Sequence, residues 1–185
     1  MGALQLKPSV PNPLLVGLVL AMLVSSAFGS RHRLLQRAMV QFRGPNATEE
    51  FLVGQNRARA TVHLGPLKWS QKLAKEASRL VTYQRDKRIC QFANLSSSEY
   101  GANQARGSYP MGPRQAVDLW VSQMQFYNHS KNLCAPTHDC SVYTQVVWKR
   151  TLEVGCAQAS CVKGATSLAI CFYFPPGNVE GESPY

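Results

Sequence analysis

Charge is scarce in this sequence, and most of it is of one sign. Only 16% of the 185 residues are Asp, Glu, Lys or Arg, and 10 acidic residues stand against 20 basic ones, which gives a net charge of +10. Aromatic residues make up only 9% of the chain, whereas 45% of it is hydrophobic. This composition excludes a disordered or fibrous chain and predicts an ordinary globular protein.

The motifs of the common enzyme classes are also absent. The chain contains no G-x-S-x-G turn, no H-E-x-x-H helix, no P-loop and no G-x-G-x-x-G after a strand. Its four histidines, which we expect to be exposed, are His32, His63, His129 and His138. Because no pair of nucleophile and base can be named, we expect no enzymatic activity and disfavour the enzyme alternative, a secreted hydrolase.

Only one hydrophobic run is long, and it lies near the start of the chain. Apolar residues fill Leu14–Val24 behind Lys7, and small residues follow. This order is typical of a secretory signal peptide over residues 1–29, cleaved after Ala27 or Gly29. The run is shorter than the about 20 residues of a membrane span. We therefore expect an extracellular protein that does not span a membrane.

All six cysteines follow this segment: Cys90, Cys134, Cys140, Cys156, Cys161 and Cys171. An even number in an oxidising compartment predicts three disulfides, although spacing alone leaves 15 pairings open. Zinc sites can be drawn with Cys156-x4-Cys161 or His138-x-Cys140, but disulfides are favoured in a secreted protein. The N-glycosylation sequons at Asn46, Asn94 and Asn128 agree with secretion.

The positive charge belongs almost entirely to the mature chain. Removal of residues 1–29 takes away only the charge of Lys7, so the net charge changes from +10 to +9. A basic protein outside the cell meets acidic polysaccharide or microbial membranes before it meets nucleic acid. Binding to such surfaces, which salt would weaken steeply, is an alternative function. No nucleic-acid partner is expected.

Hydrophobic periodicity predicts helices in the first part of the mature chain. Residues 30–46 form a basic lead-in that we expect to be flexible. One helix begins after Asn46 or Thr48, and a second follows Ser70. A third begins at Pro113, and its buried stripe consists of Val117, Trp120, Val121 and Met124.

Strand composition dominates the last part of the chain. We expect strands at Tyr143–Trp148, Leu152–Ala157 and Thr166–Phe174. Residues 93–112 form a polar stretch with Ser, Asn and Gly throughout. Helices first and strands last predict a single α+β domain.

Several short motifs occur in a fixed order along the chain. They are Asn56-x-Ala58-Arg59, Gly65-Pro66-Leu67-x-Trp69, Trp120-Val121, Tyr143-Thr144-Gln145-Val146-Val147-Trp148, Gly155-Cys156-Ala157 and Cys171-Phe172-Tyr173-Phe174-Pro175-Pro176-Gly177-Asn178. Together they resemble the plant pathogenesis-related protein 1 branch of the CAP superfamily (cysteine-rich secretory proteins, antigen 5, pathogenesis-related 1) over about residues 48–185. The stretches Tyr83–Lys87 and Phe92–Leu95 are similar to a pistil-expressed subgroup.

The resemblance implies a fold and a set of disulfides. The fold is the α-β-α sandwich of the CAP/SCP domain with a central antiparallel sheet, expected here over residues 47–174, with a tail at 175–185. The implied disulfides are Cys90–Cys156, Cys134–Cys140 and Cys161–Cys171. We expect the protein to be a monomer.

Members of this family line a central cleft with two histidines and two glutamates. The matching positions in this chain are Gln55, Ala102, Gln123 and Val142. Neutral amides and aliphatic side chains are poor ligands of zinc, and they supply no general acid or base. We therefore expect no metal and no cofactor in this cleft.

Two further features of the family are retained. Phe126, Tyr127 and Leu133 lie in a loop that the resemblance associates with sterol binding, and aromatic faces suit a flat apolar ring system. The tail from Pro175 to Tyr185 is similar to a peptide that some plant members release as a defence signal. We therefore expect an apoplastic, non-enzymatic protein of plant defence or reproductive tissue that binds a sterol or other lipid, or supplies a peptide to a receptor.

Overall fold

The structure, a computed structural model, describes residues 46–161 and 166–185. The expected signal peptide and, except for Asn46, the basic lead-in lie outside the described residues. The main elements are α2 (Ala47–Thr61), β1 (Lys68–Trp69), α3 (Gln71–Arg88), β2 (Gly101–Gly107), α4 (Pro113–Ser122), α5 (Ser141–Val146), β5 (Glu153–Ser160) and β6 (Ser167–Phe174). Between α4 and α5 lie the 3-10 turns η1 (Gln123–Phe126) and η2 (His129–Lys131) and the short strands β3 (Tyr127–Asn128) and β4 (Leu133–Cys134).

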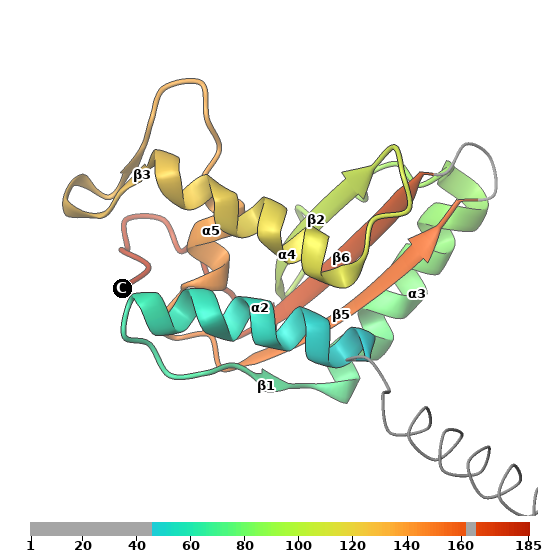
Figure 1. Ribbon diagram of the computed structural model, residues 1–185, viewed down its shortest axis with the longest axis horizontal. Helices are drawn as coiled ribbons and strands as arrows, with labels where there is room; N and C mark the ends of the chain where they lie inside the picture. Colours follow the sequence, from blue (N-terminus) through green and yellow to red (C-terminus); the bar gives the residue numbers. More distant parts are fainter. Residues whose placement is uncertain (1–45, 162–165) are drawn as a thin grey trace, which may run out of the picture. The chain divides into compact units, whose positions relative to one another are not determined.

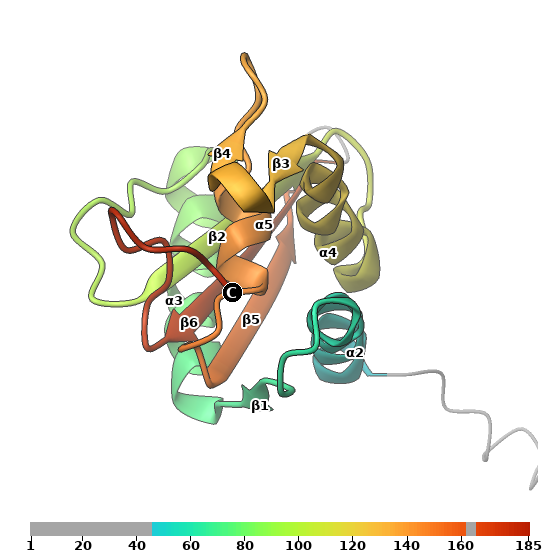
Figure 2. The ribbon, with the colours of Figure 1, turned by 90° about the vertical axis from the view of Figure 1, so that its left-hand side faces the viewer.

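A four-stranded sheet in the order β1-β5-β6-β2 forms the middle layer. β6 runs antiparallel to both β5 and β2, whereas the short edge strand β1 runs parallel to β5. Helix α3 covers one face of this sheet, and α2, α4 and α5 cover the other (Figures 1 and 2). The expected α-β-α sandwich is confirmed, and its central sheet is antiparallel except for the parallel edge pair β1–β5.

The three predicted helices are present. Asn46 caps α2 through a 2.9 Å hydrogen bond from the backbone N–H of Glu49 to its side-chain oxygen, and Glu49 and Glu50 stand in the first turn. Carboxylates at this end interact favourably with the helix dipole. No helix within residues 46–161 and 166–185 combines the length and apolar character that crossing a membrane requires.

Two segments differ from the prediction. Residues 143–148 were expected to form a strand, but they belong largely to α5. Tyr143, Val146 and Val147 are all buried, and their spacing of three and four residues is that of one helix face. No strand was predicted in the polar stretch 93–112, yet it contains β2, which pairs along its whole length with β6. Pairing with this buried strand outweighs the low β-propensity of glycine and asparagine.

The disulfides differ from the implied pairing in two of three cases. Cys134–Cys140 is confirmed, but the other bonds are Cys156–Cys171 and Cys90–Cys161. Cys156 and Cys171 are directly opposite each other on β5 and β6, with Cα atoms 4.0 Å apart, on the face covered by α2. Cys90 and Cys161 belong to the cluster beneath α3. The implied Cys90–Cys156 bond would have to join opposite faces of the sheet.

Close contact between α3 and β5 depends on a glycine. A Cβ atom at Gly155 would collide with the backbone of Leu73 and Ala74. The motif Gly155-Cys156-Ala157 therefore places a residue without a side chain toward α3 and the disulfide toward α2.

One charged side chain of α2 lies inside the core. Arg59 is only 2% exposed, and its guanidinium donates hydrogen bonds of 2.8–3.2 Å to the backbone oxygens of Gly65, Val146, Trp148 and Thr151. Burial lowers the pKa of Arg59. These bonds tie α2 to the segment before β1, to the end of α5 and to the turn before β5.

We predict that Arg59→Lys lowers the free energy of unfolding by about 3 kcal/mol, because an ammonium group cannot reach four carbonyls at once and leaves buried acceptors unpaired. The matched control Arg57→Lys changes an exposed arginine on the same helix and should stay within about 0.5 kcal/mol of the parent protein. Urea unfolding measures both. Equal stabilities of the two variants would contradict the role of Arg59.

Candidate functional site

The four positions that match the family's metal ligands do not form one cluster. Gln55 on α2 is fully buried beside the Cys156–Cys171 disulfide. Ala102 on β2 packs instead into the cluster beneath α3, on the other face of the sheet. Gln123 begins η1 and is half-buried, and Val142 on α5 contributes its backbone oxygen to the site described next.

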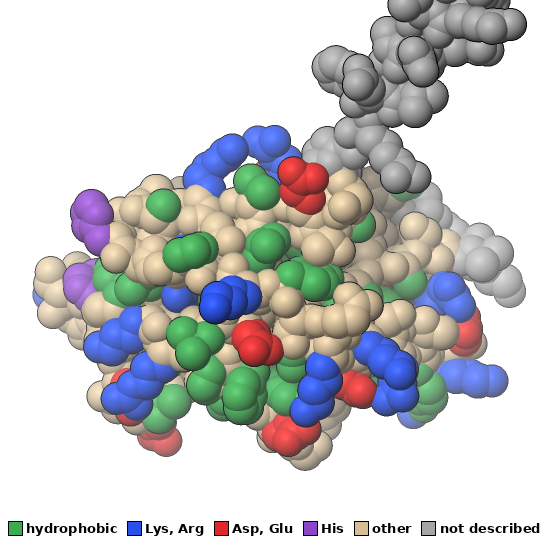
Figure 3. All heavy atoms as spheres, turned by 90° about the horizontal axis from the view of Figure 1, so that it is seen from below, with side chains coloured by type: hydrophobic (Ala, Val, Ile, Leu, Met, Phe, Trp, Pro, Cys, Tyr) green, Lys and Arg blue, Asp and Glu red, His purple; other side chains and the backbone are tan. Residues whose placement is uncertain are grey.

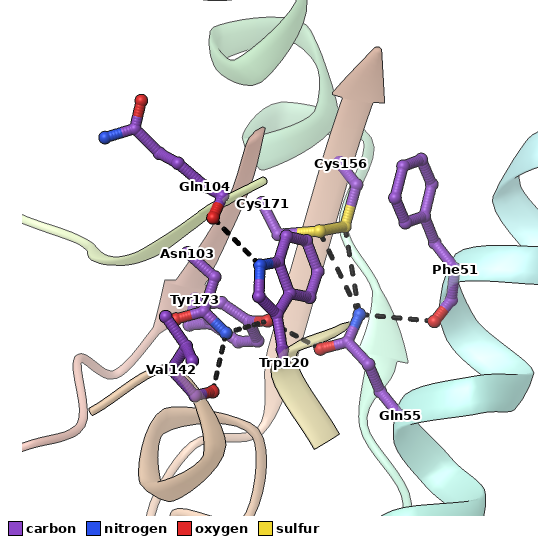
Figure 4. Close-up of a disulfide and its surroundings, with 9 residues drawn as sticks. All are labelled: Phe51, Gln55, Asn103, Gln104, Trp120, Val142, Cys156, Cys171 and Tyr173. Carbon is purple, nitrogen blue, oxygen red and sulfur yellow. Dashed lines mark hydrogen bonds between the residues drawn. A yellow bond between two sulfur atoms is a disulfide. The ribbon is translucent and has the colours of Figure 1, made fainter. Parts of the chain in front are cut away.

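A chain of neutral hydrogen bonds includes Gln55, one of the four matching positions (Figure 4). The Tyr173 hydroxyl donates to Gln55 Oε1 at 2.7 Å and accepts from Asn103 Nδ2 at 3.2 Å. Gln55 Nε2 donates to the backbone oxygen of Phe51 at 3.2 Å, and Asn103 Nδ2 also donates to that of Val142 at 2.8 Å. Burial raises the pKa of Tyr173, so its phenol remains a neutral donor. These contacts connect α2, β2, β6 and α5 inside the core.

The buried Trp120 connects α4 to β2, because its indole N–H donates to the backbone oxygen of Gln104 at 2.9 Å (Figure 4).

The residues of the cleft do not fit a zinc ion. The Gln55 amide is used at both ends, and Asn103 Oδ1 is the one acceptor of the network that lacks a partner within the described residues. A single amide oxygen cannot replace the imidazole, thiolate or carboxylate ligands that zinc requires. In the described ranges, no three His, Cys, Asp or Glu side chains gather closely enough to hold a metal ion.

The aromatic side chains of the loop after α4 pack against other side chains of the protein. The Phe126 ring stacks on His138 with the ring centroids 3.5 Å apart and the planes inclined by 13°. Tyr127 packs at 5.9 Å against Tyr143, and its hydroxyl donates to Asn132 Oδ1 at 2.7 Å. Leu133, the third loop residue expected to contact a lipid, is 60% exposed.

Four histidines were expected to be exposed. His63, His129 and His138 are exposed, and His32 lies outside the described residues.

The C-terminal tail is docked on α5 and on this loop, which the sequence did not predict. Gln145 Oε1 accepts from the backbone N–H of Gly177 at 3.0 Å, and the backbone N–H of Lys149 donates to the oxygen of Pro184 at 2.7 Å. The Tyr185 ring stacks on His129 at 4.3 Å. Further hydrogen bonds come from Thr151 to Pro175, from Asn178 to Ser141 and from Asn132 to Glu182.

An apolar groove of about 390 Å³ runs between α2 and α4, and the sequence did not predict it. It is lined by Glu49, Glu50, Val53, Gly54, Arg57, Ala58, Thr61, Arg114, Asp118, Val121 and Met124. Met124 was expected in the buried stripe of α4, but it follows the end of that helix and is 48% exposed. The α-helix ends at Ser122, and Met124 lies in the 3-10 turn η1 that begins at Gln123.

Close packing of the two helices gives the groove its floor. A Cβ atom at Gly54 would lie 2.9 Å from Val117 Cγ1, so only glycine lets α2 approach α4 this closely. Five of the residues that line the groove are charged: Glu49, Glu50, Arg57, Arg114 and Asp118. Arg114 lies 3.9 Å from Asp118, and Arg57 forms no ion pair within the described part of the chain.

Comparison with known proteins identifies the class of protein that this fold defines. The sequence matches the family described as "CAP: Cysteine-rich secretory protein family" over residues 54–174. The chain therefore belongs to the CAP family.

Its relatives place it in a branch of that family. The chain is 54% identical over 140 residues to the STS14 protein of Solanum tuberosum, covering 75% of this chain and 65% of that protein. It is 39% identical over 146 residues to pathogenesis-related protein 1A of Nicotiana tabacum, covering 77% and 83% of the two chains. The protein is thus a member of the plant pathogenesis-related protein 1 branch, and it spans about two thirds of the length of STS14.

Solved structures support the fold. The venom allergen-like protein 4 of Schistosoma mansoni superposes with a TM-score of 0.62 at 26% identity, covering 76% of this chain and 94% of that one. A crystal structure of "NaASP2 with Zn2+" superposes with a TM-score of 0.60, covering 77% and 86% of the chains. At 19% identity, this likeness shows only that the two proteins share a fold, and the zinc ion belongs to that protein.

We predict that calorimetric titration of the oxidised protein with zinc chloride shows no saturable binding that depends on Gln55 and Gln123, two of the four positions that match the family's metal ligands. The reason is that Gln55 and Gln123 present amides where the family presents ionisable ligands. Saturable binding that the variants Gln55→Leu and Gln123→Leu abolish would contradict this prediction.

Proposed function

We propose that this protein is a secreted, non-enzymatic lipid-binding protein of plant defence or reproductive tissue, and that the lipid lies in the groove between α2 and α4. The observation that carries the proposal is the groove itself. Its volume of about 390 Å³ and its apolar surface are typical of sites for small apolar ligands, although five of the eleven residues that line it are charged.

The exposed side chains of the groove favour an apolar ligand. Val53 is 49% exposed and Met124 is 48% exposed, and both belong to the lining. Covering such side chains stabilises a complex, since about 25 cal/mol is gained for each Å² of apolar surface removed from water. A methionine also adapts its shape to different ligands.

The two arginines of the groove suit the polar end of a lipid, and three carboxylates, Glu49, Glu50 and Asp118, line the same groove. Arg57 and Arg114 can donate hydrogen bonds to a carboxylate, a phosphate or a hydroxyl group. A lipid would place its apolar body along the floor and its head group at these arginines. The proposal therefore includes sterols and fatty acids, which the experiment below separates.

The aromatic loop is the competing location for a sterol. There, a ligand would have to displace His138 from Phe126 or compete with the packing of Tyr127 on Tyr143. A glycan on Asn128, which lies in the same loop and is exposed, would obstruct a flat ligand further. These contacts support the groove as the site.

Release of the C-terminal tail is the weaker hypothesis. A cut before Pro175 would leave the tail held by its contacts with Gln145, Lys149 and His129. Absence of any peptide that begins at Pro175 from the mass spectrum of the secreted fluid would exclude this function.

Binding to an acidic surface finds less support in the distribution of charge. On the face shown in Figure 3, lysine and arginine side chains are spread among acidic and hydrophobic ones and do not gather in one patch.

All of these functions depend on secretion of the protein. The three disulfides support secretion, because disulfides form and persist in oxidising compartments.

We predict that Val53→Glu with Met124→Glu weakens binding of a labelled plant sterol or a labelled long-chain fatty acid by about tenfold or more, because ligand binding would desolvate two carboxylates. The control Leu119→Glu alters an apolar side chain of α4 that is equally exposed but lies outside the groove, and it should bind like the parent. Equilibrium fluorescence titration gives the Kd values.

Two outcomes would contradict the groove as the site. One is unchanged binding by the groove variant together with loss of binding by a Phe126→Ala, Tyr127→Ala variant, which would place the lipid in the loop. The other is the absence of binding of either lipid to the parent protein.

A further inference from the structure

A second hollow, of about 360 Å³, lies at the C-terminal end of α3 and exposes aromatic side chains. It is lined by Leu80, Tyr83, Gln84, Arg88, Gln91, Phe92, Ala93 and Asn94. Phe92 is 58% exposed and Tyr83 is 48% exposed. Neither ring packs against another aromatic ring within the described residues. Both rings border the same hollow, so a group bound there could cover the two of them.

Asn94, which belongs to the lining of the hollow, begins the sequon Asn94-Leu95-Ser96. Its Oδ1 accepts hydrogen bonds from the backbone N–H and the hydroxyl of Ser96, at 3.1 and 2.8 Å. Its Nδ2, the atom to which an N-linked glycan is attached, donates no hydrogen bond to the described residues, and the side chain is exposed. A glycan on this atom would start at the hollow.

We propose that Asn94 carries an N-linked glycan whose first N-acetylglucosamine packs on Phe92 and Tyr83. In the attachment step, the bond between the sugar C1 and the diphosphate of a lipid-linked oligosaccharide breaks, Nδ2 loses a proton and bonds to C1, and the lipid diphosphate leaves. The proposal rests on secretion, which is part of the proposed function.

The hollow suits a sugar in both its apolar and its polar parts. The C–H groups of a pyranose ring and the acetyl methyl group can pack on the faces of Phe92 and Tyr83, as other amphipathic groups pack on aromatic rings. Arg88 and Gln84 border the same hollow and can hydrogen-bond the sugar's hydroxyl and carbonyl groups.

The other two sequons provide comparisons within the same chain. Asn128 also has a phenylalanine two positions before it, but the ring of Phe126 is already stacked on His138. Asn46 has Gly44 at that position. Only the sequon at Asn94 combines this spacing with a phenylalanine ring that the described residues leave uncovered.

This packing exists only in the folded protein, so the glycan should stabilise the fold, and the stabilisation should depend on Phe92. The test uses the full chain produced in secreting plant cells. Thr48→Ala and Ser130→Ala remove the other two sequons but keep Asn46 and Asn128 as caps. On this background, the parent is compared with Ser96→Ala, with Phe92→Ala and with the double variant.

We expect glycopeptide mass spectrometry to find Asn94 occupied, and Ser96→Ala to lower the Tm by about 3 °C when Phe92 is present. In the Phe92→Ala background the same change should shift the Tm by much less. The matched variant Phe126→Ala should lower the Tm equally with and without the Asn94 glycan, since Phe126 packs on protein.

Two results would overturn the proposal: a secreted protein with a bare Asn94, or a glycan effect on the Tm that is equal with and without Phe92. Either would leave secretion and lipid binding intact. A chain retained in the cell without a glycan at any sequon would instead overturn secretion together with this proposal.

Discussion

The buried guanidinium of Arg59 is the interaction on which the arrangement of α2 depends. It donates hydrogen bonds to four backbone oxygens from three separate segments, and it forms no ion pair with a carboxylate within the described residues. Because α2 also carries Gln55 toward the disulfide and Gly54 toward α4, fixing this helix fixes two surfaces at once. One is the former cleft, and the other is the groove.

These two surfaces differ in chemistry. In the cleft, Gln55, Tyr173 and Asn103 form a neutral network that is buried and fits no zinc ion. The groove, by contrast, exposes apolar side chains and places arginines beside them. The chain keeps the CAP scaffold, with amides at Gln55 and Gln123 in place of the family's ionisable ligands, and the lipid site proposed above lies between α2 and α4.

The sequence predicted the elements whose pattern is local. The N-cap at Asn46, the three long helices and β6 follow from capping residues, periodicity and a hydrophobic run. It did not predict β2, because that strand depends on pairing with β6, nor α5, because β-branched composition there conceals helical spacing. The disulfides and the groove depend on which face of a strand or helix each residue occupies, and motif spacing carries no such information.

The location of a bound lipid tests this account most directly. Amide hydrogen exchange, followed by mass spectrometry with and without a saturating plant sterol or long-chain fatty acid, reports it. A lipid bound in the groove should slow exchange in residues 49–61 and 114–124, which line the groove, and leave exchange in residues 126–134 unchanged. Protection confined to residues 126–134 would contradict it.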